Sequence, residues 1–146
     1  MSRHTARIHA LNMVFQLPFH MEREKPEIEE AVEYYLQILP EFKGLLKGIS
    51  PDEEEKDFIK DEIIGTFTHL KDIDILIDGY LKNWDLERIA KIDLAILRLA
   101  LYEIKHAAGV STGTAINEAV ELAKIYGTDD SYAFINGVLG RVDRSG

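Results

Sequence analysis

The sequence predicts an all-α protein, and three observations support that fold class. Apolar residues recur at spacings of three and four from residue 51 onward, as they do on one face of a helix. No segment alternates strictly between apolar and polar residues, which is the pattern of a half-buried strand. All 4 prolines lie at or before position 51, so none interrupts the later helices. We expect about seven helices in one domain spanning residues 1–146.

Prolines bound the first two helices. The first is predicted to run from about Arg3 to Leu17 and to end at Pro18, because proline cannot continue a helix. The second is predicted to run from Pro26 to about Leu39, because proline suits the first turn. The apolar face predicted for the first helix consists of Ile8, Leu11, Val14 and Phe15.

The third helix carries a start signal in the run SPDEEEKDFIKDEIIGTFTHL, residues 50–70. Ser50 is predicted to cap the helix, Pro51 to take its first position and Glu53 to complete a capping box. The acidic residues 52–55 also suit the positive end of the helix dipole. A metal site is the alternative for this acidic run, but a helix start already accounts for it.

Two further helices are predicted over residues 72–84 and about 86–106. The second of these is apolar almost all round, which is typical of a buried central helix. Lys91, Arg98 and Lys105 are spaced seven apart, so we expect them to mark one narrow exposed stripe on it.

Threonine, glycine and acidic residues bound the last two helices. Thr112 or Thr114 starts the first of them, and Gly127 is predicted to end it in the left-handed conformation common at helix ends. Asp129 or Asp130 is predicted to cap the last helix.

The charge is acidic overall but uneven along the chain. Lys plus Arg number 17 and Asp plus Glu 26, a net charge of −9, which disfavours non-specific binding of nucleic acid. The first acidic residue is Glu22, and the basic residues before it are Arg3, His4, Arg7, His9 and His20. This positive start is either a solvated helix face or a binding surface. No signal peptide, membrane span or cysteine is found, so a soluble, cytoplasmic protein is expected.

Catalytic signatures are absent. The sequence lacks H-E-x-x-H, a glycine-rich phosphate loop and a nucleophile elbow. One Glu-x-x-His pair, Glu103 and His106, falls short of the two that a di-iron bundle needs. We therefore expect neither an enzyme nor a metal or cofactor site. Arg98, set among apolar residues, is interpreted as a structural ion-pair partner of Glu118 or Glu121.

Two asparagines stand in the middle of apolar helical runs. Asn117 and Asn136 have low helix propensity, so buried positions with hydrogen-bonded amides are one explanation. Shaping a surface where a ligand docks is the other. Phe134 is similarly either a core residue or a platform on which a base stacks.

The C-terminal half carries three motifs that point to a known family. The segments ILRLALYEI (96–104), AINEAVELAKIYG (115–127) and DDSYAFINGVL (129–139) resemble the NusB family of bacterial transcription antitermination factors. RHTARIHALNMVF (3–15) and IDGYLKNWDLERIAKID (77–93) fit that family's opening and middle. The resemblance covers nearly the whole chain and is weakest over residues 19–50.

The resemblance implies two helical bundles packed together and a function without catalysis. It implies binding of boxA, a single-stranded RNA element of ribosomal RNA leaders. It also implies a heterodimer with NusE, a small-subunit ribosomal protein, within an RNA polymerase antitermination complex.

Residue roles follow from the same resemblance. The RNA-binding positions would be Arg3, His4 and Arg7 at the start of the first helix. The loop before the last helix and the first turn of that helix would add Asp130, Tyr132 and Phe134. The NusE interface would include Phe15 and Asp93. Our own hypothesis, separate from the resemblance, is that Asn117 and Asn136 hold the last two helices in position for RNA.

The basic start is thinner here than the resemblance leads one to expect. It offers two arginines and a histidine on a body of net charge −9, so tight RNA binding is expected only for the heterodimer with NusE. The alternative is a helical interaction module, or a homodimer that hides its basic face, with little RNA affinity of its own.

Overall fold

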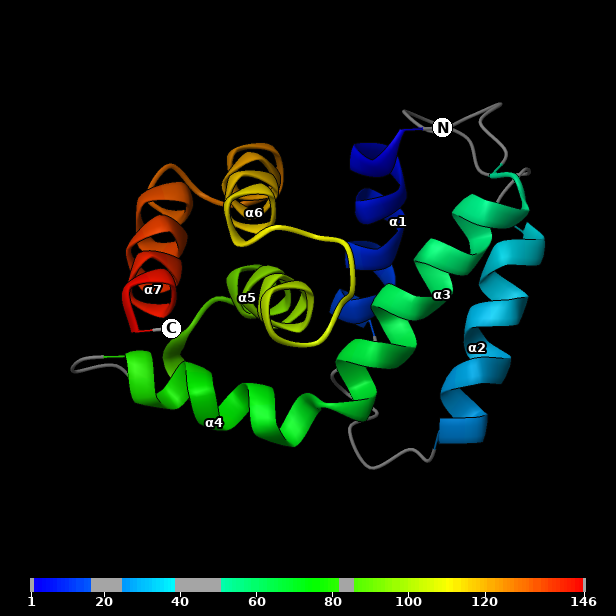
Figure 1. Ribbon diagram of the computed structural model, residues 1–146, viewed down its shortest axis with the longest axis horizontal. Helices are drawn as coiled ribbons and strands as arrows, with labels where there is room; N and C mark the ends of the chain where they lie inside the picture. The colour runs from blue at the N-terminus through cyan, green and yellow to red at the C-terminus, as the bar shows by residue number, and fades with distance from the viewer. Residues whose placement is uncertain (1, 17–24, 39–50, 82–85, 146) are drawn as a thin grey trace. The chain divides into compact units, whose positions relative to one another are not determined.

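Helices account for all the regular structure in the residues that the computed structural model describes, which are 2–16, 25–38, 51–81 and 86–145. This result confirms the all-α prediction (Figure 1). The elements within those ranges are α1 (Arg3–Gln16), α2 (Lys25–Ile38), α3 (Glu53–Thr68), α4 (Leu70–Tyr80), η3 (Leu86–Arg88), α5 (Lys91–Lys105), α6 (Thr112–Tyr126) and α7 (Ser131–Ser145). No helix in this described part is long and apolar enough to cross a membrane.

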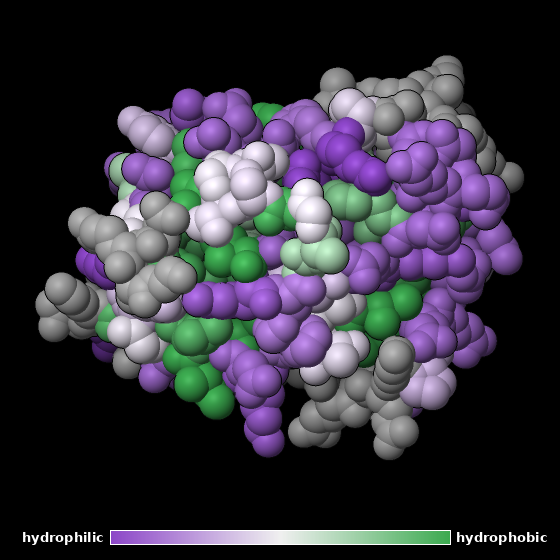
Figure 2. All heavy atoms as spheres, in the orientation of Figure 1, coloured by the Kyte–Doolittle hydropathy of each residue, from purple (hydrophilic) through white to green (hydrophobic). Residues whose placement is uncertain are grey.

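The chain divides into two compact units, Met1–Thr68 and His69–Gly146. Both units contain buried apolar side chains. On the face seen in Figure 2, hydrophilic residues predominate and hydrophobic ones form separate patches between them.

In the first unit, α3 packs against both α1 and α2. The buried apolar residues include Ala6, Ala10, Val14, Val32, Ile59 and Ile63. A polar contact joins α1 to α2 inside this core, where His9 Nδ1 lies 3.0 Å from the Tyr35 hydroxyl. Phe15 does not complete the predicted apolar face, because it lies in the last turn of α1 with 39% of its surface exposed.

The start of α3 lies two residues later than predicted. The Asp52 carboxylate accepts a hydrogen bond from the Glu55 backbone N–H at 2.8 Å, and the Glu55 carboxylate accepts one from the Asp52 N–H at 3.1 Å. A reciprocal capping box therefore forms, but Asp52 and Glu55 make it in place of Ser50 and Glu53. Ser50 itself lies outside the described residues.

In the second unit, α5 is central and packs against α4, α6 and α7. Its fully buried side chains include Ile96, Leu97, Leu99 and Leu101. The single helix predicted from 86 to 106 is wrong at its start, because η3 is separated from α5 by Ile89 and Ala90. The predicted end at Trp84 of the preceding helix lies outside the described residues.

Arg98 breaks the predicted exposed stripe of α5. Lys91 and Lys105 are exposed, but α4 covers the middle of the stripe and buries Arg98. Arg98 Nε and Nη2 donate to the two oxygens of the Asp74 carboxylate, each at 2.9 Å. Sequence analysis did not identify Asp74 as the counter-ion of Arg98. Of the two predicted partners, Glu118 and Glu121, the second pairs with Lys124 on its own helix at 3.4 Å.

Gly127 ends α6 without adopting the predicted left-handed conformation, since its φ is −89° and its ψ −170°. Glycine is required there for space, because a Cβ would lie 2.4 Å from Ser131 Cβ. Ser131 organises the following turn: its Oγ accepts from the Thr128 N–H at 2.9 Å, and its own N–H donates to the Thr128 carbonyl at 3.1 Å. Asp130 immediately precedes α7, and its carbonyl accepts from the Phe134 N–H, while capping by the side chain of Asp129 or Asp130 stays a prediction.

Candidate nucleic-acid interface

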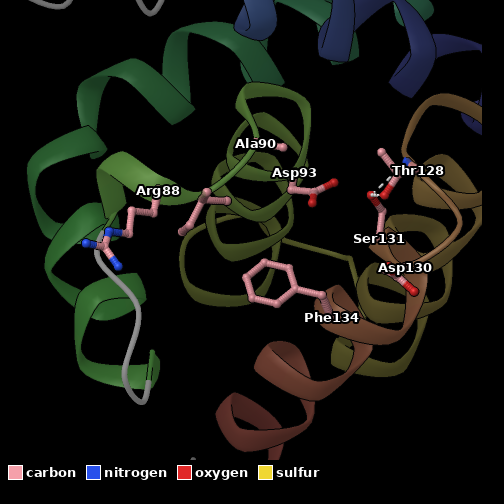
Figure 3. A pocket seen from close by; sticks show the side chains of 8 residues that line it. Arg88, Ala90, Asp93, Thr128, Asp130, Ser131 and Phe134 are labelled. Carbon is pink, nitrogen blue, oxygen red and sulfur yellow. Dashed lines mark hydrogen bonds between the residues drawn. The ribbon is translucent and has the colours of Figure 1, made fainter.

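A hollow of about 260 Å³ opens in the second unit beside the start of α7 (Figure 3). We call it the Asp93 hollow. Four segments form it: η3 with the residues after it, the first turn of α5, the loop from α6 into α7, and the first turn of α7. Its lining residues are Arg88, Ile89, Ala90, Asp93, Thr128, Asp130, Ser131 and Phe134.

The Asp93 carboxylate is the unusual group in this hollow. Asp93 is 8% exposed, and its Oδ1 is buried with no hydrogen-bond partner among the described residues. Its side chain points toward the side chains of Thr128 and Ser131 (Figure 3). Because a buried acceptor without a donor is costly, this carboxylate is suited to an N–H group supplied by a ligand or another protein.

Aromatic and charged groups complete the wall and rim. Phe134 is half-buried on α7, while Asp130 and Arg88 are exposed. The hollow therefore combines a flat apolar ring, hydroxyl groups and charges of both signs. The sequence had assigned Asp93 to a protein partner and Asp130 and Phe134 to RNA, but the structure brings all three to one hollow.

Three polar residues that line the Asp93 hollow were missed by sequence reasoning. Thr128 and Ser131 belong to the turn that precedes α7, and their spacing of three is the signal that could have identified them as turn-forming hydroxyls. Arg88 lies in the segment 77–93, where nothing distinguished it from a solvated arginine.

Tyr132 lies in a different hollow, of about 520 Å³, between the outer faces of α6 and α7. We call it the Tyr132 hollow. Tyr132 is exposed, and Lys124 Nζ lies 5.8 Å from its ring centre. The residues lining this hollow are Asn117, Val120, Glu121, Lys124, Tyr132, Ala133, Asn136 and Gly137.

Asn117 and Asn136 are exposed, so the explanation by buried amides is wrong. The residues that α6 buries are Ala115, Ala119, Leu122 and Ala123, and those that α7 buries include Ile135, Val138, Leu139 and Val142. Both asparagines fall outside these stripes and face solvent, each contributing its amide to the Tyr132 hollow. Glu118 is half-buried on α6.

The basic start of α1 lies in the first unit and is largely engaged by α3. Arg3 Nη2 is 3.4 Å from Glu54 Oε1, and the Arg3 guanidinium lies 4.2 Å from the centre of the Phe58 ring. Arg7 is buried, with its Nε 4.0 Å from Glu62 Oε1. A solvated basic face is therefore the wrong description at Arg7, because α3 packs over that position of α1. His4 is half-buried.

Comparisons with known proteins agree with this arrangement. The NusB family model matches residues 4–144. The Transcription antitermination protein NusB of Agathobacter rectalis is 40% identical over 141 residues, covering 97% of this chain and 98% of the relative. That of Acetivibrio thermocellus is 37% identical over 142 residues, covering 97% and 88%. The chain belongs to the NusB family.

Solved structures support the fold of this NusB family member. T. maritima NusB superposes with a TM-score of 0.76 at 31% identity, over 99% of this chain and 92% of that one. A chain in "Crystal Structure of a Plectonemic RNA Supercoil" gives a TM-score of 0.78 at 20% identity, over 98% and 94%, which speaks for the fold alone. As a NusB family member, the protein belongs with transcription antitermination factors, which are regulators and not enzymes.

Proposed function

We propose that this NusB family member binds single-stranded boxA RNA as a heterodimer with NusE and acts in the cytoplasm, in the RNA polymerase complex that antiterminates ribosomal RNA operons. The observation that carries the proposal is the Asp93 hollow. There, a half-buried aromatic ring and a buried carboxylate oxygen without a partner among the described residues line one cavity.

Single-stranded RNA suits the chemistry of this hollow. Unpaired bases stack on aromatic rings and expose their hydrogen-bonding edges. Phe134 supplies the ring, and the carboxylate and hydroxyl groups of Asp130, Thr128 and Ser131 can accept from base amino groups. The protein has little positive charge with which to attract the RNA phosphates, because its net charge is −9. A basic partner would supply that charge and would be attracted by the acidic surface.

Two features support a protein partner. Asp93 offers a cationic or amide N–H donor a carboxylate oxygen that has no hydrogen-bond partner in the described part of the chain. Phe15 exposes 39% of a large apolar residue at the end of α1, in the first unit. We assign both to the NusE interface, and we assign Arg3 and His4 of α1 to the RNA contacts.

Fluorescence anisotropy with a labelled boxA RNA tests the proposal. The protein is titrated alone and with NusE from the same source, against a scrambled RNA at near-physiological salt. We expect sequence-selective binding that tightens sharply with NusE. Phe134→Ala should then weaken binding by about 5-fold to 100-fold, the effect of losing a stacked base. Tyr34→Ala removes an exposed aromatic from α2 and is the matched control, expected to change nothing. Absence of selective binding with NusE present would refute the proposal.

One observation favours a second candidate. Arg7 is buried and Arg3 is paired with Glu54, so the free basic surface of α1 is small. A helical interaction module, or a homodimer with weak RNA binding of its own, would need little exposed positive charge on α1. Sedimentation velocity at the protein concentrations of the anisotropy assay separates a homodimer from a monomer, and the titration without NusE measures the intrinsic affinity.

A further inference from the structure

The acidic first half of α3 lies directly against the basic start of α1 in the first unit. Glu54, Phe58 and Glu62 are spaced four residues apart on α3, and Arg3 and Arg7 are spaced four apart on α1. Residues at that spacing share one face of a helix, so the two sets meet as facing stripes. The contacts bear this out, because both guanidinium groups lie over the Phe58 ring, at 4.2 Å for Arg3 and 5.4 Å for Arg7.

The two arginines differ in how firmly α3 holds them. Arg7 is buried beside the buried Glu62 carboxylate, so it cannot leave without opening the α1–α3 contact. The Arg3 side chain is 48% exposed, and its partner Glu54 is 83% exposed. The contact between Arg3 and Glu54 can therefore open while the fold stays intact.

The Glu54 carboxylate accepts from one N–H donor of Arg3, Nη2 to Oε1 at 3.4 Å, which is a donor that an RNA phosphate would also use. A guanidinium recognises a carboxylate and a phosphate through the same N–H donors. We propose that Glu54 is a built-in competitor of RNA for Arg3, so that RNA must displace its carboxylate before Arg3 can bind a phosphate. This inference rests on the proposed RNA-binding function and names a residue that lowers its affinity.

The position of Glu54 is set by the cap of α3. Asp52 and Glu55 form the capping box that orders the first turn, which holds Glu54 toward α1. Glu53, in the same turn, is directed along its own helix and pairs with Lys56 at 3.4 Å. Two glutamates of equal charge thus stand side by side, and Glu54 is the one in contact with Arg3.

This pair provides a matched experiment. Glu54→Gln and Glu53→Gln each remove one negative charge from the first turn of α3, so they change net charge and helix-dipole interactions alike. Affinity for boxA RNA is measured by anisotropy with the NusE heterodimer at about 0.1 M salt. We expect Glu54→Gln to bind RNA about 2-fold to 5-fold more tightly than Glu53→Gln, the effect of releasing one exposed ion pair. Matching circular dichroism melts establish that both variants are folded.

A second background tests whether Arg3 carries the effect. In Arg3→Gln protein, Glu54→Gln and Glu53→Gln should bind RNA equally, because the cation for which Glu54 competes is gone. Equal affinities of the two variants in the presence of Arg3 would overturn the inference and leave the proposed function standing. A Glu54→Gln advantage that persists without Arg3 would also overturn it. If wild-type protein with NusE binds no RNA selectively, the proposed function itself is wrong and this inference falls with it.

Discussion

Replacing Asp74 with asparagine should measure how far the second unit depends on one buried arginine. The Arg98 side chain is 6% exposed on the central helix α5, and Asp74 on α4 is 23% exposed. Two hydrogen bonds of 2.9 Å join them in the bidentate geometry that arginine and carboxylate prefer. Asp74→Asn keeps the shape of the side chain but removes its charge and one acceptor, leaving a desolvated guanidinium without its bidentate partner.

The size of the effect follows from the burial of the two groups. Removing one partner of a fully buried pair costs about 3–5 kcal/mol, whereas an exposed pair contributes about 0–1 kcal/mol. Asp74 is partly exposed, whereas Arg98 is almost completely buried. We therefore expect Asp74→Asn to lower the free energy of unfolding by about 2–3 kcal/mol. For a chain of this length, that corresponds to a fall in Tm of roughly 4–10 °C.

Urea denaturation and thermal melts followed by circular dichroism would measure this loss. Asp78→Asn is the matched control, since it makes the same chemical change at an exposed position of the same helix and should cost less than about 0.5 kcal/mol. In an Arg98→Met background, Asp74→Asn should also cost little, because no buried charge remains to be compensated. Equal costs for Asp74→Asn and Asp78→Asn in the wild-type background would refute the reasoning.

Three further outcomes follow from the structure. Burial lowers the pKa of His9 from 6.5 to about 4, so the unfolded state binds the proton more tightly. Stability should be full above pH 6.5 and fall by up to about 3 kcal/mol as the pH drops to 4, with a flatter profile in His9→Gln, measured by urea denaturation at each pH. Gly127→Ala should lose about 1–3 kcal/mol because its Cβ would meet Ser131, whereas Gly137→Ala, whose Cβ would meet nothing within 4 Å, should gain about 0.5–1 kcal/mol; an equal response in thermal melts would contradict the steric argument. Asp93→Asn should leave the stability of the free protein unchanged or raised but weaken NusE binding at least about tenfold by calorimetry, and unchanged NusE affinity would count against the proposed interface.

Local patterns in the sequence predicted the all-α class and the family. Helix formation rests on hydrogen bonds between residues four apart and on apolar spacing within one segment, so it can be read locally. The start of α1 at Arg3 was therefore predicted correctly, and α6 starts at Thr112, one of the two threonines predicted for it. The motifs of the C-terminal half pointed to the NusB family, which the match over residues 4–144 confirms.

Which polar side chains are buried depends on how the helices pack against one another. Arg98 and Lys105 have the same spacing and charge on α5, yet Arg98 is covered because α4 brings Asp74 over it. Asn117 stands within an apolar run, and a buried amide was one explanation for it. It faces solvent because the buried face of α6 is the one that carries its alanines. A helical pattern tells which residues share a face but not which face a neighbouring helix will cover.

In the candidate site too, sequence motifs identified single residues, and helix packing brought them together. Asp130 and Phe134 were identified from one motif, and Asp93 from another 37 positions before Asp130 in the sequence. That Asp93 shares a hollow with them, and that its Oδ1 is buried without a partner among the described residues, depends on α5 packing beside the α6–α7 turn. Spacing along the chain carries no information about such contacts, since they are set by how whole helices pack.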